Sequence, residues 1–405
     1  MRRSTHRILT THGGALRRPD DLAQLVSAKD RGEPVDGAAL RRRISIGTKE
    51  AVQEQSRCGV DVVNDGEFPK ISWMGYHTTR LDGIEKKPPG KANGHPLYGR
   101  DSDQFPGWYA LAARMDGPMY SPMLRVDQPP AFPPQGDIPV CVGPLSYIGR
   151  DQAEFDIENL KAASAGSHVE DLFLSAIGPS MLEWSLPNEY YKTSEDYVFA
   201  IAGAMREEYQ LITDAGIVLQ LDEPTLTTNW ALNPWASMNL EEYRRWLNVR
   251  VEAMNFALNG IDPGMVRVHF CWGSWHAPHS TDIPLSDVLD VILKLNVGAF
   301  SFEASNPRHA HEWRVWEQVK LPEGKILIPG VIGHFSDYIE HPELIADRIV
   351  QYAKIVGREN VIAGTDCGIG SRVGHPEVCW AKFRALAEGA RLASKRLWEP
   401  SATHA

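Results

Sequence analysis

Residues 266–271 read Val-Arg-Val-His-Phe-Cys, a short apolar run that closes on two side chains able to bind a metal. His269 and Cys271 are two positions apart, so they point to the same side of a strand that continues through them. Such a pair can chelate one ion at the end of that strand. On spacing alone, a core histidine beside a buried cysteine explains the pair equally well.

Short apolar runs of this kind recur along the chain and alternate with longer helix-like stretches. This alternation is typical of a parallel α/β fold. The runs lie at 7–11, 60–64, 138–142, 172–176, 217–221, 266–271, 299–303, 326–331 and 361–364. Because a (β/α)8 TIM barrel has places for eight strands, we expect one run, within 138–176, to be an accessory strand or no strand.

Two segments between these runs have a distinct character. Residues 194–215 are a clear helix candidate, because Ser194 can cap the start and Gly216 lies just past the end. Residues 86–135 are rich in proline, glycine and aromatic residues and show no sustained period, which predicts a hairpin and loops covering a face of the barrel or an oligomer contact. We therefore expect residues 1–405 to form a single barrel domain with an insertion at 86–135.

Composition restricts the class of partner. The chain has 405 residues, 43% of them hydrophobic, which is enough to bury a large core. A formal charge of −10 argues against nucleic-acid binding and favours small-molecule partners. The first residues, MRRSTHRILTT, do not resemble a secretory signal, and no apolar run reaches the roughly 18 residues of a membrane span. We expect a cytoplasmic protein that does not enter a membrane, and a homo-oligomer remains open.

The five cysteines are too few and too scattered for a disulfide framework in a chain of this length. An odd number of cysteines in a reducing compartment indicates free thiols or metal ligands. We expect Cys58, Cys141 and Cys379 to be small buried hydrophobic residues.

Three ends of apolar runs carry side chains of the kinds that bind metals. They are the His269 and Cys271 pair, Glu303 at the close of its run, and Cys367 at a glycine-flanked turn. If these are carboxyl ends of barrel strands, they converge on the rim where barrel active sites lie. One nitrogen, two sulfurs and one carboxylate oxygen suit tetrahedral zinc better than magnesium or calcium. Taken alone, Glu303 could equally be an ion-paired structural residue.

The order of these pieces resembles the cobalamin-independent methionine synthase family, in its catalytic-barrel form, and relatives that include the epoxyalkane:coenzyme M transferases. The resemblance covers nearly the whole chain and is carried by residues 10–14, 64–67, 143–144, 219–224, 269–271, 301–303, 329–331 and 365–368. In that family the matching His, Cys, Glu and Cys bind zinc. The resemblance therefore implies that His269, Cys271, Glu303 and Cys367 are zinc ligands here.

The resemblance implies zinc-dependent transfer of an alkyl group, a methyl in the leading hypothesis, to a small thiol held as a zinc thiolate. The donor would be of the 5-methyltetrahydrofolate type and the acceptor a thiol of the homocysteine type. Glu303, the single hard oxygen donor, would be the ligand that the substrate sulfur displaces. One alternative is an epoxide or other alkyl transferase to coenzyme M or a similar thiol. Another is a non-catalytic zinc-binding barrel or a zinc hydrolase, although two cysteines make the hydrolase less favoured.

Two acids, Glu67 and Asp222, match family positions that bind the homocysteine amino group, which favours an ammonium-bearing thiol over a sulfonate. A structural ion-pair role for either acid is the alternative. His12, in the loop after the first run, and Trp230 are further substrate-binding candidates. The aromatic residues that could stack on a pterin or line an apolar pocket are Trp73, Tyr76, Trp230, Trp272 and Trp275. The cations near the rim, which would favour a sulfonate, are Arg17, Arg18, Lys70 and Arg372.

The group that leaves must accept a proton as its bond to carbon breaks. His334 follows the apolar run 326–331, in a loop where methionine synthases also carry a histidine, and is our candidate general acid. The alternative is a histidine on a surface loop without a chemical role.

Overall fold

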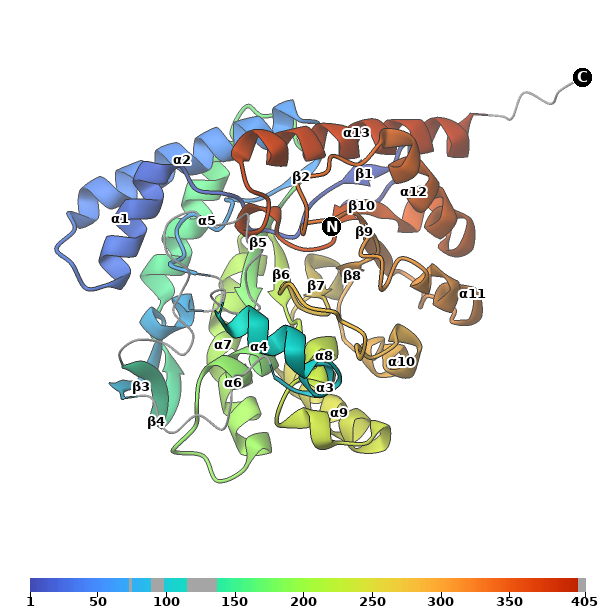
Figure 1. The fold of residues 1–405 in the computed structure, drawn as a ribbon. Coiled ribbons are helices and arrows are strands. Elements are labelled where there is room, and N and C mark those ends of the chain that lie inside the picture. Colours follow the sequence, from blue (N-terminus) through green and yellow to red (C-terminus); the bar gives the residue numbers. More distant parts are fainter. Residues whose placement is uncertain (73–74, 89–97, 115–136, 400–405) are drawn as a thin grey trace, which may run out of the picture.

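The barrel predicted from the sequence is confirmed. The computed structural model describes residues 1–72, 75–88, 98–114 and 137–399. Eight parallel strands lie in the order β1-β10-β9-β8-β7-β6-β5-β2 and form a nearly closed barrel surrounded by helices (Figure 1). The strands are β1 (Leu9–Thr10), β2 (Val62–Val63), β5 (Asp171–Ile177), β6 (Val218–Asp222), β7 (Val266–Phe270), β8 (Ala299–Glu303), β9 (Ile326–Ile332) and β10 (Ile362–Thr365).

The ninth apolar run forms an accessory strand, as expected for one run within 138–176. It lies in β4 (Ile138–Tyr147), which pairs antiparallel with β3 (Leu81–Lys87) in a separate two-stranded sheet. Because neither strand joins the barrel, eight of the nine runs supply the eight parallel strands.

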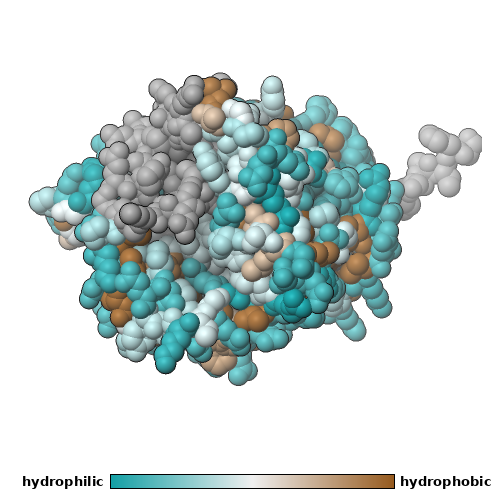
Figure 2. Space-filling view, turned by 60° about the horizontal axis from the view of Figure 1, so that its bottom comes forward, coloured by the Kyte–Doolittle hydropathy of each residue, from teal (hydrophilic) through white to brown (hydrophobic). Residues whose placement is uncertain are grey.

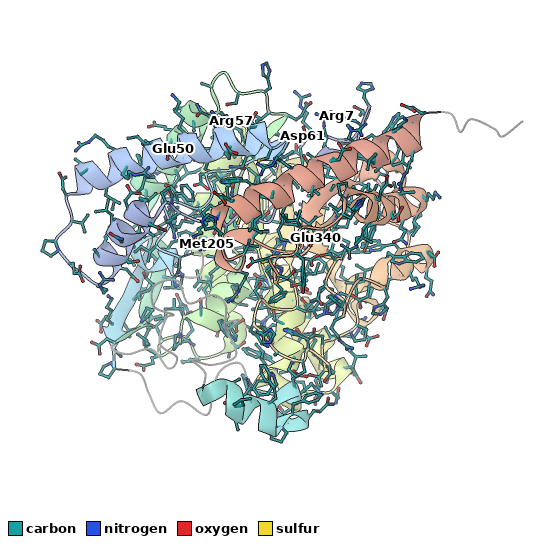
Figure 3. All side chains as sticks on the ribbon, turned by 45° about the horizontal axis from the view of Figure 1, so that its top comes forward. Arg7, Glu50, Arg57, Asp61, Met205 and Glu340 are labelled. Carbon is teal, nitrogen blue, oxygen red and sulfur yellow. The ribbon has the colours of Figure 1, made fainter. Side chains whose placement is uncertain are left out.

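The shortest strands, β1 and β2, lie at the two ends of the strand order and are joined across the seam by side chains. Asp61, just before β2, accepts hydrogen bonds from the Thr10 amide at 2.8 Å and from Arg7 at 2.7 Å. The Thr11 hydroxyl donates to the Val62 carbonyl at 3.0 Å. Figure 3 shows Arg7 and Asp61 side by side at this point. The Asp61 amide also donates to the Thr10 carbonyl at 3.1 Å, so polar side chains and one backbone hydrogen bond together close the seam.

Helices cover the outside of the barrel. The α-helices are α1 (Asp20–Asp30), α2 (Gly37–Arg57), α3 (Arg100–Gln104), α4 (Pro106–Arg114), α5 (Arg150–Ser164), α6 (Pro179–Ser185), α7 (Ser194–Asp214), α8 (Thr225–Thr228), α9 (Leu240–Ala257), α10 (Leu289–Ile292), α11 (Val315–Gln318), α12 (Pro342–Val356) and α13 (Pro376–Trp398). Short 3-10 turns lie between them. Within the described ranges, no helix combines the length and apolar character that crossing a membrane requires.

The helix predicted at 194–215 is α7, but its predicted cap is wrong. Thr193 has the extended backbone of an N-cap, and its hydroxyl accepts from the Asp196 amide at 3.0 Å. Ser194 is already helical, and its hydroxyl donates to Glu183 instead. Serine and threonine are both common N-cap residues, so either could begin this helix. The contact of Ser194 with Glu183 explains why Thr193 is the cap here. Gly216 follows the helix at φ +76°, as predicted.

The 86–135 segment begins in the hairpin that we expected, since Lys86 and Lys87 end β3 and pair with β4, but its described part also contains two helices that we did not expect. Residues 89–97 and 115–136 lie outside the description. Helices α3 and α4 lie beside α8 at one end of the barrel (Figure 1). Arg100 donates to the Trp230 carbonyl at 2.9 Å, and Asp101 accepts from the His279 amide at 3.0 Å. Helix α3 therefore bridges the loops that follow β6 and β7. The face turned forward in Figure 2 is mostly hydrophilic, with scattered hydrophobic residues.

A buried ion network ties the accessory hairpin and two helices to the barrel. Arg80 pairs with Asp156 of α5 and, at 3.1 Å, with Glu208 of α7. Tyr76 and Tyr147 also donate to Glu208, at 3.0 and 2.8 Å. Burial acts to raise the pKa of Glu208, but Arg80, Lys70 and the two tyrosine hydroxyls together outweigh burial and hold that pKa below its ordinary value. The network is therefore built around the charge of Arg80.

We predict that Arg80→Met destabilises the fold by about 3–5 kcal/mol, because it leaves two buried carboxylates without their cation. Chemical denaturation of the purified chain measures the change. The control is Arg57→Met, since the Arg57 side chain is 71% exposed and its pair with Glu54 should contribute at most about 1 kcal/mol. Equal losses in the two variants would contradict a stabilising role for the network.

Candidate metal centre and substrate site

Three of the four predicted ligands come together at the carboxyl ends of the barrel strands. His269 lies in β7, Cys271 directly follows β7, and Cys367 follows β10. One ligand atom from each lies within 4.8 Å of the others, and these three residues are the single such group in the described part of the chain. His269 and Cys271 are each 3% exposed. The strand-end convergence expected from the sequence therefore produces a compact donor set.

The ring of His269 is oriented so that one nitrogen is free for a ligand. Its Nδ1 lies 3.1 Å from the Ser301 hydroxyl on the neighbouring strand β8. Its Nε2 is buried and has no hydrogen-bond partner among the described residues. A metal-binding histidine characteristically has its second nitrogen fixed in this way by a protein group.

The two thiols differ strongly in acidity. The hydrogen bond between them lowers the pKa of Cys367 well below its ordinary value, and the His269 ring acts in the same direction. The same hydrogen bond, together with burial, raises the pKa of Cys271 well above its ordinary value. Cys367 is therefore the first of the two to ionise, and a cation placed between them would be needed to ionise both.

Glu303, the fourth predicted ligand, ends β8 but does not belong to the three-residue group. Its Oε2 accepts from Nδ2 of the Asn306 side chain at 2.8 Å, and its Oε1 is buried without a partner among the described residues. Burial and the nearby Asp366 raise its pKa well above the ordinary range, and it acts electrostatically on Cys271 and Cys367. The carboxyl group is thus adjacent to the thiols, with one oxygen available.

The donor set fits zinc. A buried imidazole nitrogen and a buried carboxyl oxygen without partners are costly unless something pairs with them. Here both lie beside two thiols, and the combination of soft sulfur with nitrogen favours zinc over hard cations such as magnesium.

Two glycines allow the loop after β1 to pass close to both Cys367 and Glu67. A Cβ at Gly13 would lie 2.5 Å from the carbonyl carbon of Cys367. Gly14 has φ +114°, and a Cβ there would lie 2.6 Å from Glu67 and 2.7 Å from Ser175. No larger residue fits at either position without moving these groups. The loop therefore brings the thiol and carboxylate halves of the site together.

Glu67 and Asp222 are both buried, and their carboxyl groups interact through their charges. Burial, followed by mutual repulsion, raises the pKa of Glu67 to about 7, and burial raises that of Asp222 to about 6. Glu67 has a left-handed backbone at φ 62°, which is rare for a residue with a side chain and is typical of functional positions. Gln220 donates to Asp222 at 2.7 Å. The charge of Lys70 lowers the pKa of both acids, so a further cation beside them would favour their ionised forms.

The nearby cations are largely engaged with backbone carbonyls. Arg18 donates to the Glu67 carbonyl at 2.7 Å, and Lys70 donates to the Ser175 carbonyl. Arg17 donates to the Gly374 carbonyl at 2.8 Å. These side chains therefore brace the loops of the site.

His12 and Trp230, the other two substrate-binding candidates, are both in contact with protein groups. Both ring nitrogens of His12 are engaged, with Gln55 at 2.8 Å and with the Gly14 amide at 3.2 Å. Burial lowers the pKa of His12 to about 3, so the ring is neutral and holds the glycine loop. Trp230 is stacked by the Arg100 guanidinium at 3.8 Å.

The other aromatic candidates are mostly occupied by protein contacts. Tyr76 is bonded to Glu208, Trp272 stacks on His309, and Trp275 packs against Gly273 and His279. Trp73 lies outside the described residues. These contacts leave no obvious stacking platform among them.

His334 is buried at the rim and is not a surface-loop histidine. Its exposed fraction is 0%, its Nε2 lies 2.8 Å from the Ser274 hydroxyl, and its Nδ1 has no partner among the described residues. Burial lowers its pKa to about 4, so the ring is neutral near pH 7. Glu340, labelled in Figure 3, accepts from the Gly333 amide at 2.8 Å and from Lys382 at 2.7 Å, which fixes this loop.

Several residues of the site were not assigned roles from the sequence. Arg267 lies two positions before His269 on the same side of β7, and this period-two spacing could have revealed it. Asp366, beside Cys367, accepts from the Ala304 and Ser305 amides at 2.8 and 2.9 Å, joining the ends of β8 and β10. Ser274 carries no recognisable pattern, because its contact with His334 is long-range.

The fold and site together define a (β/α)8 barrel with an imidazole and thiol cluster at the carboxyl ends of its strands. Residues 162–388 match the family model described as cobalamin-independent synthase, catalytic domain. The chain belongs to this family.

Curated relatives and solved structures agree with this assignment. The chain is 22% identical over 393 residues to a methionine synthase of Saccharolobus solfataricus, covering 96% of this chain and 95% of that protein. It is also 22% identical to a methionine synthase of Sulfurisphaera tokodaii, covering 96% and 93%. A B12-independent methionine synthase from Shewanella sp. W3-18-1, solved with selenomethionine, superposes with a TM-score of 0.70 at 20% identity, covering 96% and 99%. At this identity the structural likeness shows the fold alone.

We predict that the chain binds one zinc ion and that Cys271→Ser or Cys367→Ser weakens binding on the order of 100-fold or more, because each removes a thiolate. Competition with a chromophoric chelator measures the affinity. Cys58→Ser is the matched control, since burial raises the pKa of Cys58 to about 11 and the residue is remote from the cluster. Equal affinity in all three variants would exclude this cluster as the metal site.

Proposed function

We propose that this chain is a zinc-dependent methyltransferase that transfers a methyl group to the sulfur of homocysteine or a closely similar amino thiol. The observation that carries the proposal is the placement of a thiol and imidazole cluster beside two buried acids. The cluster suits a substrate sulfur, and the acids suit a substrate ammonium group. Family membership and the methionine synthase relatives support the same activity.

The four residues that would hold zinc are His269, Cys271, Cys367 and Glu303. Zinc, when bound, favours the ionised form of a nearby thiol, the competent nucleophile at neutral pH. Ser301 orients His269, and Glu303, as the single hard oxygen donor among the four, would be the ligand most readily exchanged.

The acids set the orientation of the acceptor. An ammonium group between Glu67 and Asp222 would relieve their mutual repulsion and satisfy both carboxylates. The Gly13–Gly14 loop lies against both Cys367 and Glu67, so a short amino thiol could reach the two halves of the site at once. Binding of this kind supplies proximity and orientation before chemistry.

His334 is suited to move a proton at the rim. When Ser274 donates to Nε2, the ring proton resides on Nδ1, the nitrogen without a protein partner. A neutral imidazole in that state can donate a hydrogen bond from Nδ1 to the departing group of a methylated pterin or related donor. The Nδ1 proton would transfer only as Nε2 takes up a proton through the Ser274 hydroxyl, which solvent then restores, so that the ring ends neutral.

A sulfonate thiol such as coenzyme M is a poorer fit. Its anionic end would meet Glu67 and Asp222, and the heads of Arg18 and Lys70 are occupied by backbone carbonyls. We therefore expect repulsion at the position where an amino thiol is attracted.

The decisive experiment supplies the zinc-loaded protein with a methylated folate and either homocysteine or coenzyme M. We predict methionine from homocysteine and at least tenfold less product from coenzyme M, measured by mass spectrometry. Glu67→Gln should raise the KM for homocysteine on the order of tenfold, because one ammonium-binding charge is lost. Glu85→Gln, on the exposed hairpin β3–β4, is the control.

Product from coenzyme M alone would overturn the assignment of the acceptor. Zinc binding without product from either thiol and a panel of methyl donors would leave a non-catalytic zinc barrel as the better description.

We predict that His334→Gln lowers kcat on the order of 100-fold or more with little change in the KM for homocysteine, because the proton donor contributes at the transition state. Steady-state kinetics measures both constants. His168→Gln, on an exposed loop before β5, should behave as the unmodified chain does. An unchanged kcat in His334→Gln would assign the proton transfer to another group.

A further inference from the structure

Four ionisable residues outside the donor set form a buried chain next to it. His279 Nδ1 lies 3.1 Å from Asp282 Oδ2, and the same oxygen lies 3.0 Å from His309 Nε2. His309 Nδ1 lies 3.1 Å from Glu312 Oε2. The four side chains are at most 7% exposed. We refer to His279, Asp282, His309 and Glu312 as the rim array.

The hydrogen-bond partners of the rim array determine which ring nitrogens carry a hydrogen. His279 Nε2 lies 2.9 Å from the Trp275 carbonyl oxygen, so both nitrogens of this ring face oxygen acceptors. Both nitrogens of His309 face carboxylates. Carbonyls and ionised carboxylates only accept, so each of these four contacts needs a hydrogen on nitrogen. Two imidazolium rings balanced by two carboxylates satisfy every contact at once.

The electrostatic surroundings of the two rings agree with two imidazolium groups balanced by two carboxylates. Burial acts to lower the pKa of both rings. For His279 the hydrogen bond and charge of Asp282, the Trp275 carbonyl and the charge of Asp101 together outweigh burial, and Asp282 with Glu312 does so for His309, so both pKa values are raised. Asp101 of α3 also faces His279, and the Arg308 guanidinium donates to the His279 carbonyl at 2.8 Å. Glu303 is the further acid that acts on Asp282 by charge, and Tyr352 lies near Glu312.

The rim array is in direct contact with the residue that follows a candidate ligand. The ring of Trp272 stacks on His309 with centroids 3.7 Å apart and planes 15° apart. Its indole nitrogen donates to the Ile283 carbonyl at 2.7 Å. A cation against an indole face is attracted by the ring quadrupole. Trp272 directly follows Cys271 and lies two residues before Ser274. The position of its ring therefore constrains the positions of both Cys271 and Ser274.

The array also joins three separate segments. His279 and Asp282 belong to the loop after β7, His309 and Glu312 to the loop after β8, and Asp101 of α3 accepts from the His279 and Ser280 amides at 3.0 Å each. His279 has a left-handed backbone at φ 53°, a conformation that these contacts hold in place. No ring nitrogen of the array is left to bind a metal.

We propose that His279 and His309 are positioning residues, held as a buried imidazolium pair by Asp282 and Glu312, which fix Trp272 and thereby the Cys271–Ser274 segment at the metal centre. The protonation state is independent of the activity proposed above, whereas the positioning role rests on the proposed metal site. The array acts through Trp272 and does not touch the substrate.

The protonation state is tested by nitrogen NMR of the zinc-loaded chain labelled with ¹⁵N-histidine. We expect two of the 14 histidines to give imidazolium shifts on both nitrogens at pH 7, and one of these to disappear in His309→Gln. Glu312→Gln keeps an acceptor for His309 but removes the charge, so it should shift the titration of His309 to lower pH. Neutral rings for both array histidines at pH 7 would overturn the proposal.

The positioning role is tested by zinc affinity. We expect His309→Gln to weaken zinc binding about tenfold. We expect Glu312→Gln to weaken it increasingly, relative to the unmodified chain at the same pH, as the pH rises from 6 to 9. The matched control is His311→Gln, an exposed histidine two residues away, which should bind zinc as the unmodified chain does. Unchanged affinity in both array variants would overturn the positioning role.

Failure of the proposed function gives a different pattern. A chain that binds zinc but does not methylate a thiol leaves these affinity ratios intact. If the unmodified chain binds no zinc, amide hydrogen exchange over residues 272–283 becomes the readout, with at least tenfold faster exchange expected in His309→Gln and not in His311→Gln. Equal exchange in those two variants would overturn the proposal.

Discussion

The guanidinium of Arg267 inside the barrel is the contact on which the site is built. It donates to Gln220 at 2.8 Å, to the Thr11 hydroxyl at 2.9 Å and to the His12 carbonyl at 2.9 Å, so it joins β6, β7 and the loop after β1. Burial lowers its pKa to about 9, which still leaves it charged at neutral pH. Because Gln220 in turn bonds to Asp222, this one cation sets the position of an acid that faces the thiols.

Burial explains why the groups above this cation behave unlike their exposed counterparts. Burial and nearby charge raise the pKa values of Glu67 and Asp222, lower that of His334, and give the two thiols different acidities. These shifts arise from burial and from the close approach of ionisable groups to one another. A cation at the thiols and an ammonium group at the acids would favour the ionised forms of both sets of groups, which is why the two halves of the site are best understood together.

Much of this arrangement could be predicted from the sequence, because strand ends in a parallel barrel converge by geometry. The eight strands follow from apolar runs, and the meeting of His269, Cys271 and Cys367 follows from where those runs stop. Contacts between loops could not be predicted in this way. Thr193 in place of Ser194 as a cap and the bridging position of α3 depend on tertiary neighbours, which no local pattern records.

The rim array is another contact between loops that the sequence alone does not predict. Its balance of charge explains how it can lie beside a metal centre. Two imidazolium rings alone would place positive charge close to the thiols and compete with a metal for them. Alternation with Asp282 and Glu312 makes the array neutral as a whole, so its net field falls off quickly with distance. The loops after β7 and β8 can therefore carry the rim array a few residues from the thiols. The rim array fixes the geometry of these loops without changing the charge balance at the thiols.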